Sequence, residues 1–369
     1  MTKYITSLII CLSFQLFSQA QSQLSATIIG SGSPKYNVER AGPSVLISYE
    51  NTHILIDMGN GTQANLEKLN IKNKDLNGLL FTHHHLDHNE EFTPLFIKTL
   101  LSGNHFDIVG PKPTTDLVNT ILKNYEEDIA YRLSKKQRTF SDVETHFTIN
   151  ELKGGETFNI GDIKITSTPV NHTISTLAYR FDAGGTSIVI SGDLSYSETL
   201  APLAKQADYL IIDSGGSIEL GKTNRRKASN KIRTNKEFAH VNLYESSLMA
   251  KEAEVKNLVL THFNFTNVDE DATSAELHKN YSGTIFYAED LMSFPKNSKN
   301  QKNTVKPNKA DNTNQQAPNF KKMLSRMDTN KDGKISKTEA KGRLKENFDK
   351  RDGNKDGFIA ETEFSRSNP

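Results

Sequence analysis

Short apolar runs alternate with amphipathic stretches and with Gly- and Asn-rich turns between Leu24 and Phe294. Runs of about four or five residues rich in Val, Ile and Leu are typical of buried strands, whereas apolar residues at every third or fourth position predict helices. The expected strands are Ala26–Ile29, Ser44–Ser48, His53–Ile56, Leu79–Phe81, Ile163–Ser167, Ser187–Ser191, Tyr209–Ile212 and Leu258–Leu260. The expected helices are Thr114–Asn124, Leu243–Val255 and Asp271–Lys279. Strands and helices mixed in this way predict an α/β sandwich.

A separate apolar stretch opens the chain. It follows a lysine, runs from Ile5 to Phe17, and ends in Ser-Gln-Ala at 18–20. A positive start, a short apolar segment and small residues are typical of a secretory signal. The stretch is shorter than the roughly 20 residues that a spanning helix needs. We therefore expect a signal peptide over residues 1–20, no membrane span, and a secreted or periplasmic protein. The only cysteine, Cys11, lies in this stretch, so the mature chain would form no disulfide.

The composition changes after Phe294. Residues 296–316 contain one valine and one alanine as their only aliphatic side chains apart from a proline. Such a segment buries too little apolar surface to offset its ordering entropy. The expected organisation is therefore a main domain over residues 21–294, a flexible linker over 295–317 and a small module over 318–369.

The charge of the whole chain is nearly balanced. Its 45 Lys and Arg residues face 44 Asp and Glu residues, which gives a formal net charge of +1. A chain with so little net charge gives no reason to expect general affinity for nucleic acid or anionic membranes. We therefore expect no specific nucleic-acid partner.

A dense histidine motif follows the apolar run Gly-Leu-Leu-Phe. It reads Thr-His-His-His-Leu-Asp-His over residues 82–88. In a loop at the end of a strand, His83 and His85 can point to one side while Asp87 and His88 turn toward another. Imidazole nitrogen and carboxylate oxygen suit zinc and similar divalent ions.

This His-x-His-x-Asp-His motif after a strand resembles the signature of the metallo-β-lactamase superfamily. The other elements of that pattern occur downstream in order, each just after a predicted strand: His172, Asp193 and His262. Asp57, in Leu-Ile-Asp-Met-Gly, matches the aspartate that supports the metal loop in that superfamily. The resemblance implies a four-layer αββα sandwich.

The resemblance also implies two metal ions, with zinc the expected metal. The implied ligands are His83, His85 and His172 for one ion, Asp87, His88 and His262 for the other, and Asp193 as the bridge. Cations held roughly 3.5–4 Å apart repel each other and need such a shared carboxylate. A dinuclear centre of this kind hydrolyses esters, because the metals activate water and stabilise charge on the substrate.

Further segments resemble one branch of the superfamily, that of ribonuclease Z and the arylsulfatase-like proteins. They are Gly-Ser-Gly-Ser-Pro at 30–34, Arg-Ala-Gly-Pro-Ser at 40–44, and the stretch 240–262. In that branch a histidine at the position of His240 donates a proton or holds an oxyanion. Asp87 and His240 are thus the expected catalytic residues. Ile-Asp-Ser-Gly-Gly, which contains Asp213, stands where tRNA-processing members carry His-Glu-Ala-Thr, and this difference argues against tRNA processing.

The C-terminal module contains two loops that fit the EF-hand pattern. Oxygen ligands at alternate positions, a glycine at the turn and a final glutamate are what calcium requires. The expected calcium ligands are Asp328, Asn330, Asp332, Lys334 and Glu339 in the first loop and Asp352, Asn354, Asp356, Phe358 and Glu363 in the second, with Lys334 and Phe358 in the position that binds through the backbone carbonyl. Ala360 provides no side-chain oxygen at the ninth position of the second loop.

These features predict a secreted two-metal hydrolase of anionic phosphodiester or sulfate esters, with a calcium-binding tail. Two alternatives remain open at this stage. One is a calcium-dependent binding or attachment protein with an inactive hydrolase domain. The other is an intracellular tRNA 3′-processing endonuclease, which requires that the N-terminal stretch is retained. The sequence does not determine the oligomeric state.

Overall fold

The computed structural model describes residues 22–221, 239–296 and 327–360 except 342 and 347, together with the single positions 232, 324 and 363. The predicted signal peptide and all but the first two residues of the predicted linker lie outside these residues. The chain divides into two compact units, residues 1–307 and 308–369, and each is described separately below. Among the described residues, none of the helices combines the length and apolar content needed to cross a membrane.

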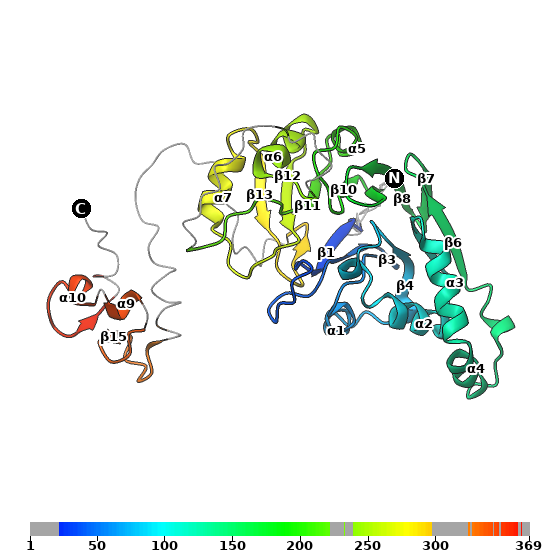
Figure 1. The fold of residues 1–369 in the computed structure, drawn as a ribbon, viewed down its shortest axis with the longest axis horizontal. Helices are drawn as coiled ribbons and strands as arrows, with labels where there is room; N and C mark the ends of the chain where they lie inside the picture. Colours follow the sequence, from blue (N-terminus) through cyan, green and yellow to red (C-terminus); the bar gives the residue numbers. More distant parts are fainter. Residues whose placement is uncertain are drawn as a thin grey trace, which may run out of the picture. The chain divides into compact units, whose positions relative to one another are not determined.

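Two sheets form the centre of the first unit (Figure 1). The first sheet has, in spatial order, β14 (Ser293–Phe294), β1 (Ser25–Gly30), β2 (Ser44–Tyr49), β3 (Thr52–Ile56), β4 (Leu76–Leu80), β5 (Phe106–Pro111) and β6 (Phe147–Leu152). The second has β13 (Thr284–Tyr287), β12 (Asn257–Thr261), β11 (Tyr209–Asp213), β10 (Thr186–Ile190), β9 (Thr176–Ala183), β8 (Ile163–Val170) and β7 (Thr157–Ile160).

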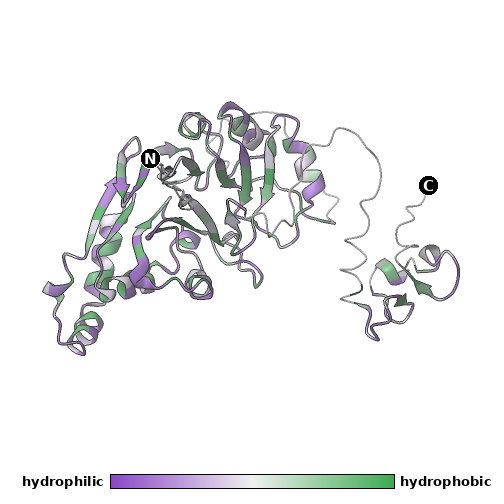
Figure 2. Ribbon diagram, turned by 180° about the vertical axis from the view of Figure 1, so that it is seen from behind, coloured by the Kyte–Doolittle hydropathy of each residue, from purple (hydrophilic) through white to green (hydrophobic). Residues whose placement is uncertain are grey.

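Helices cover the outer face of each sheet. The first sheet is covered by α1 (Thr62–Lys68), α2 (Phe92–Ser102), α3 (Thr114–Asn124) and α4 (Glu126–Ser134), and the second by α5 (Leu200–Leu203), α6 (Leu243–Glu252) and α7 (Glu270–Leu277). In Figure 2 the central strands are mostly green, whereas the covering helices also carry purple. The predicted four-layer αββα sandwich is therefore confirmed.

Both faces of the first sheet are buried, because neighbouring apolar residues of one strand point to opposite faces. In β3, Ile54 and Ile56 pack in the core shared with the second sheet, and Leu55 packs in the core beneath α1 and α2. Successive side chains of a strand point to opposite faces, so a strand that is apolar at every position fits only between two apolar layers.

All the predicted strands and helices of the first unit occur, with small shifts at their ends. Shifts of three residues occur at the start of β4, which spans Leu76–Leu80 and was predicted as Leu79–Phe81, and at the ends of β8 and α6. The start of β4 was not predicted because it contains Asn77, and asparagine is depleted in strands. The Asn77 side chain accepts a hydrogen bond from the His53 backbone N–H at 2.9 Å, which compensates for that low propensity. Helix α2 was not predicted, although Phe92, Phe96 and Leu100 give the helical spacing.

The second unit is a small module with its own core. Strands β15 (Ile335–Ser336) and β16 (Phe358–Ile359) pair antiparallel. Helices α9 (Arg343–Glu346) and α10 (Phe348–Arg351) lie between them in the chain. The buried apolar residues are Ile335, Ala340, Leu344, Phe348 and Ile359.

Candidate metal centres

The predicted ligands of the first unit come from loops at the ends of strands in both sheets. The loop after β4 carries His83, His85, Asp87 and His88, and single ligands follow β8, β10 and β12. Strand β4 runs parallel to β3 and β5, and β10 runs parallel to β11 and β12. The carboxyl ends of parallel strands meet at one edge of a sheet, which is where ligand sites form in α/β proteins.

One group of side chains consists of His83, His85, His172 and Asp193, whose ligand atoms all lie within 4.8 Å of one another. The His85 Nδ1 atom is 3.1 Å from His83 Nε2 and 3.2 Å from His172 Nε2. Three ring nitrogens that face one another at these distances have room for only one or two protons between them, so not every nitrogen can be paired by a hydrogen bond. A divalent cation among them would accept all three lone pairs, so the donor set fits a metal ion.

A second group consists of Asp87, His88 and His262, and Asp193 lies beside it, with oxygens 3.5 Å from His88 Nε2 and 3.3 Å from His262 Nε2. The buried His88 Nε2 atom has no hydrogen-bond partner among the described residues. It lies 3.6 Å from Asp87 Oδ2 and 3.5 Å from Asp193 Oδ1. These separations are long for hydrogen bonds but suit neighbouring ligands at about 2.0–2.2 Å from one ion. The orphaned nitrogen therefore fits a second metal site.

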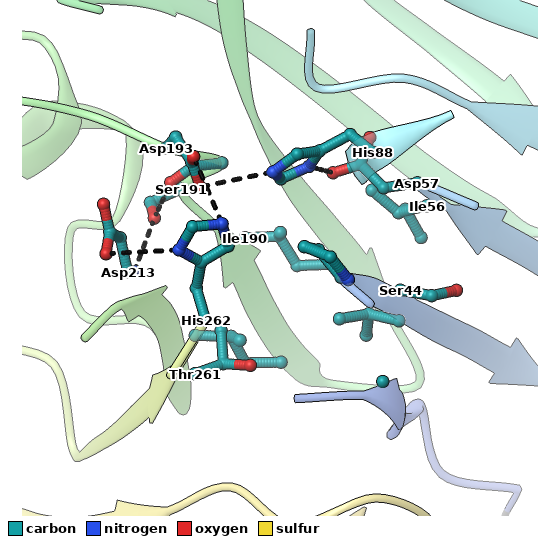
Figure 3. A pocket seen from close by; sticks show the side chains of 15 residues that line it. Ser44, Ile56, Asp57, His88, Ile190, Ser191, Asp193, Asp213, Thr261 and His262 are labelled. Carbon is teal, nitrogen blue, oxygen red and sulfur yellow. Dashed lines mark hydrogen bonds and ion pairs between the residues drawn. The ribbon is translucent and has the colours of Figure 1, made fainter. Parts of the chain in front are cut away.

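Asp193 lies between the two groups. Its Oδ2 atom is 3.3 Å from His262 Nε2 and 3.9 Å from His83 Nε2. Figure 3 shows Asp193 pointing toward both His88 and His262, in a pocket between the two sheets. The seven predicted ligands thus come together in the two groups that the sequence resemblance implied, with Asp193 common to both.

The electrostatics of the centre favour bound cations. Burial and the neighbouring His88 lower the pKa of His83, so this ring is neutral and its lone pair is available. Burial alone would lower the pKa of His88, but the carboxylates of Asp193 and Asp57 raise it well above its ordinary value. Burial opposes the charge on Asp193, yet the surrounding imidazoles hold the pKa of that carboxyl well below its ordinary range. The carboxylates of the cluster thus attract positive charge to its centre, which a bound metal ion would supply in place of protons.

Asp57 fixes the orientation of His88. Its Oδ2 atom accepts hydrogen bonds from His88 Nδ1 at 2.8 Å and from the Thr82 hydroxyl at 2.7 Å, and its Oδ1 atom accepts from the Thr82 backbone N–H at 2.8 Å. Asp57 and His262 both have left-handed backbone conformations, with φ of 57° and 63°. Such conformations cost non-glycine residues on the order of 1–3 kcal/mol and concentrate at functional sites.

Replacing Asp57 with alanine should lower metal affinity by about 10–100-fold, because loss of a partner that orients a ligand has typically that effect. The ring of His88 would lose its acceptor, and the Thr82 backbone would lose its anchor. Competition with a chelator of known affinity would measure the change. The control is Asp107→Ala. Asp107 lies near the start of β5, at the end of the strand away from the ligand loops, and this variant should bind metal normally. Unchanged affinity in Asp57→Ala would contradict the supporting role.

His240 makes a short contact with Asp213, a residue for which no role was predicted from the sequence. The His240 Nδ1 atom is 2.5 Å from Asp213 Oδ2, and Asp213 is 2% exposed. The same His240 atom is 3.9 Å from Asp193 Oδ2, so the pair lies beside the predicted bridge. Asp213 ends β11, which lies between β10 and β12, the strands followed in the chain by Asp193 and His262; this position was the signal that could have identified it.

The contact between His240 and Asp213 is a hydrogen bond and not another metal site. These two residues form a possible ligand group with Asp193 and His262. Two ligands of one ion lie about 3 Å apart or more when each bond is about 2.0–2.2 Å. A separation of 2.5 Å is too short for two ligands of one ion, and it fits a short hydrogen bond between a ring N–H and a carboxylate, since charge shortens such bonds. Asp213 therefore holds a proton on Nδ1 of His240.

The two loops of the second unit share several internal hydrogen bonds. In the first loop Asp328 Oδ2 accepts from the Gly333 backbone N–H, and in the second Asp352 Oδ2 accepts from that of Gly357, both at 2.9 Å. Both glycines have positive φ, 80° and 84°, as the tight turn of a calcium loop requires. Ligand oxygens of Asp352, Asp356 and Glu363 lie within 4.8 Å of one another.

The first loop should bind calcium more tightly than the second. Ser336 provides a hydroxyl at the ninth position, and this hydroxyl donates to Glu339 Oε2 at 2.7 Å. Ala360 occupies the equivalent position and can donate only through its backbone N–H, at 3.2 Å from Glu363 Oε2. Glu339→Gln should therefore abolish the tighter of two binding events in calorimetry, and Glu363→Gln the weaker. On the prediction that the protein is exported, the affinities should be about 10⁻⁴–10⁻³ M, the range of extracellular modules. Two equal sites would contradict this ranking.

Comparison with known proteins supports the assignment of both units. A family model described as anti-Pycsar protein Apyc1 matches residues 24–219, and an EF-hand model matches residues 320–339. Ribonuclease Z of Mycobacterium bovis is 27% identical over 249 residues, which cover 65% of this chain and 86% of that protein.

Solved structures show the same fold. The metallo-β-lactamase-fold protein YhfI from Bacillus subtilis has a TM-score of 0.57 at 20% identity, over 73% of this chain and 98% of that one. The short form of human tRNase Z has a TM-score of 0.54 at 21% identity, with the same coverage. The resemblance to the ribonuclease Z branch of the metallo-β-lactamase superfamily, with an added EF-hand, is confirmed.

The expectation of no specific nucleic-acid partner was wrong. It is contradicted by the ribonuclease Z and tRNase Z relatives, whose names identify enzymes that act on RNA. The error came from using the net charge of the whole chain. A total of +1 averages over all residues, whereas a phosphodiester is attracted by the local charge of the site, to which two bound cations would contribute most.

Proposed function

We propose that this chain, which belongs to the anti-Pycsar protein Apyc1 family, is a two-metal hydrolase of phosphodiester bonds in RNA or nucleotides. The ribonuclease Z relatives confirm the coarser prediction of a metal-dependent hydrolase that acts on ester bonds. The observation that carries the finer proposal is the position of the Asp213–His240 pair directly beside the shared carboxylate of two ligand groups.

The ligand side chains would hold the two ions, for which zinc fits the histidine-rich donor set best. When bound, such an ion pair lowers the pKa of water, orients the phosphoryl group and neutralises charge on its oxygens. Asp193 would keep the two ions together because its oxygens reach both groups. Asp57 would keep the His88 ring turned so that Nε2 faces the centre.

The chain's own proton donor would be His240. Its Nδ1 atom is bonded to Asp213, so a proton for the leaving oxygen would come from Nε2. His240 is 35% exposed, whereas Asp213 is almost fully buried, so the imidazole can reach a substrate while the carboxylate stays behind it. This order of groups is that of a base or acid held in one tautomer by a buried carboxylate.

Hydrolysis of sulfate esters and export are further parts of the sequence prediction. A sulfate monoester carries the same single charge as a phosphodiester, so the centre alone does not separate them, and the ribonuclease Z relatives favour phosphodiesters. The apolar stretch Ile5–Phe17 supports export of the mature chain. The intact set of ligands argues against a purely attaching, inactive domain, because clustered buried charges are costly to keep without a cation.

The experiment is a substrate panel with purified, metal-loaded protein. It would contain a chromogenic phosphodiester, short RNA oligonucleotides, cyclic and linear nucleotides, a sulfate ester and a lactone. We expect the phosphodiesters to have the highest kcat/KM and chelation to abolish turnover. A clear preference for the sulfate ester or the lactone would overturn the proposal. Sequencing the N-terminus of the mature protein would test export separately.

A further inference from the structure

The loop that carries His172 is joined to the loop that carries Asp193 by short hydrogen bonds. The Ser197 hydroxyl accepts from the Asn171 backbone N–H at 2.8 Å and donates to the Ser195 carbonyl at 2.9 Å. The Ser195 backbone N–H in turn donates to the Asn171 carbonyl at 2.8 Å. Asn171 immediately precedes one ligand, and Ser195 follows the other by two residues, so these bonds connect the two ligands over a short path.

Ser197 is the buried centre of this connection. It is 1% exposed, and its hydroxyl serves as both donor and acceptor. The Asn171 side chain adds a bond to the Tyr196 carbonyl at 2.9 Å. The Thr199 hydroxyl donates to the Pro169 carbonyl at 2.6 Å. Residues 195–199 are therefore fastened to the end of β8 along the whole turn that leads to His172.

His172 needs this external support more than the three fully buried histidine ligands. It is half-buried in a loop, and its neighbours Asn171 and Thr173 are exposed. By contrast, His83, His88 and His262 are at most 3% exposed. Among the residues that the structure describes, the Nδ1 side of the His172 ring is held by the hydrogen bond that it donates to the Ala239 carbonyl at 2.8 Å. Its backbone position therefore depends on the bonds through Ser197.

We propose that Ser197 is a positioning residue that sets the spacing between His172 and Asp193. It thereby sets the affinity of the ion held by His83, His85 and His172. A metal site needs its ligand distances to within about 0.2 Å, so a loop that drifts by more than this loses affinity. The other ion is supported separately, through Asp57 and His88. This inference rests on the two-metal centre of the proposed function.

The test is a metal titration of apo protein, with Co²⁺ or Zn²⁺ against a competing chelator. Wild type should bind two ions per chain. In Ser197→Ala one ion should bind about 10-fold more weakly, the lower end of the range for loss of a group that bonds a ligand directly, because Ser197 acts through the Asn171 and Ser195 backbone, while the other ion binds unchanged. Ser195→Ala should have a smaller effect, because it removes only the long 3.2 Å side-chain bond to Asn171 and keeps the backbone bond.

A matched control is Ser274→Ala. Ser274 is also buried and hydrogen-bonded, to Tyr287 at 2.7 Å, but it lies on α7 away from the ligand loops. Ser274→Ala should lower the thermal stability by about as much as Ser197→Ala does, and it should leave both metal affinities unchanged. Ser197→Thr, which keeps the hydroxyl, should restore most of the affinity.

The outcomes separate this inference from the proposed function. Equal binding of two ions by wild type and by folded Ser197→Ala, checked by circular dichroism, would overturn the role of Ser197 alone. A loss of affinity in Ser274→Ala as large as in Ser197→Ala would also overturn it, since the effect would then be general destabilisation. A wild-type chain that takes up no ions would overturn the two-metal function and this inference together.

Discussion

Replacing Asp193 with alanine should lower turnover by about 10³-fold or more, because stabilisation of charge by a two-metal centre is worth several kcal/mol. Asp193 is the side chain common to both ligand groups, with oxygens within 3.3–3.9 Å of ring nitrogens of His83, His88 and His262. Without it, two cations would face each other with no shared anion. Elemental analysis should therefore show that the two ions fall to one or none.

The control for Asp193→Ala is Asp208→Ala. Asp208 also accepts hydrogen bonds, from the Ser187 backbone N–H and from Lys256. It immediately precedes β11, so it lies at the edge of the second sheet opposite to the ligands. It should lower thermal stability and leave metal content and turnover close to wild type. Two retained ions with normal turnover in Asp193→Ala would rule out the bridging role.

Replacing Asp213 with asparagine should lower turnover by about 10²–10⁴-fold, the usual contribution of a positioned general acid or base. The substitution keeps the shape of the side chain and removes the charge that holds the proton on His240. His240→Ala should cause a loss of similar size, and the double variant should lose little more, because the two residues act as a unit. Both variants should keep two ions per chain. If Asp213→Asn instead loses an ion, Asp213 is a ligand and the assignment of the short contact as a hydrogen bond is wrong.

The pH profile gives a second measurement of this pair. Burial lowers the pKa of His240, but the hydrogen bond and charge of Asp213 more than offset this and raise the pKa to about 9. The imidazolium is therefore present at neutral pH and is lost as pH rises through the raised pKa. In Asp213→Asn that support disappears, so the alkaline limb of kcat against pH should move to lower pH. If the alkaline limb does not move in Asp213→Asn, His240 is not the proton donor.

The local pattern of the sequence was enough for the fold and for most of the candidate centre. Short apolar runs mixed with amphipathic stretches predicted the α/β sandwich, and consecutive apolar residues such as Ile54–Ile56 in β3 need an apolar layer on each side of the sheet. The ligands were recognisable because each one follows a strand directly, as His262 follows β12. The calcium loops were recognisable because their ligands are close together in the chain, so spacing and geometry carry the same information.

Only the tertiary structure shows the contacts that orient and connect these ligands and the contact that holds a proton on His240. Asp213 and His240 are 27 residues apart, and Asn171 and Ser197 are 26 apart, so no local spacing indicates either contact. The left-handed backbone of Asp57 is likewise imposed by the residues packed around it. Contacts of this kind form only after the strands of both sheets are in register, because each partner is held by a different strand end. The sequence thus determined which side chains can bind metal, and the packing of the two sheets determined which neighbours hold them in place.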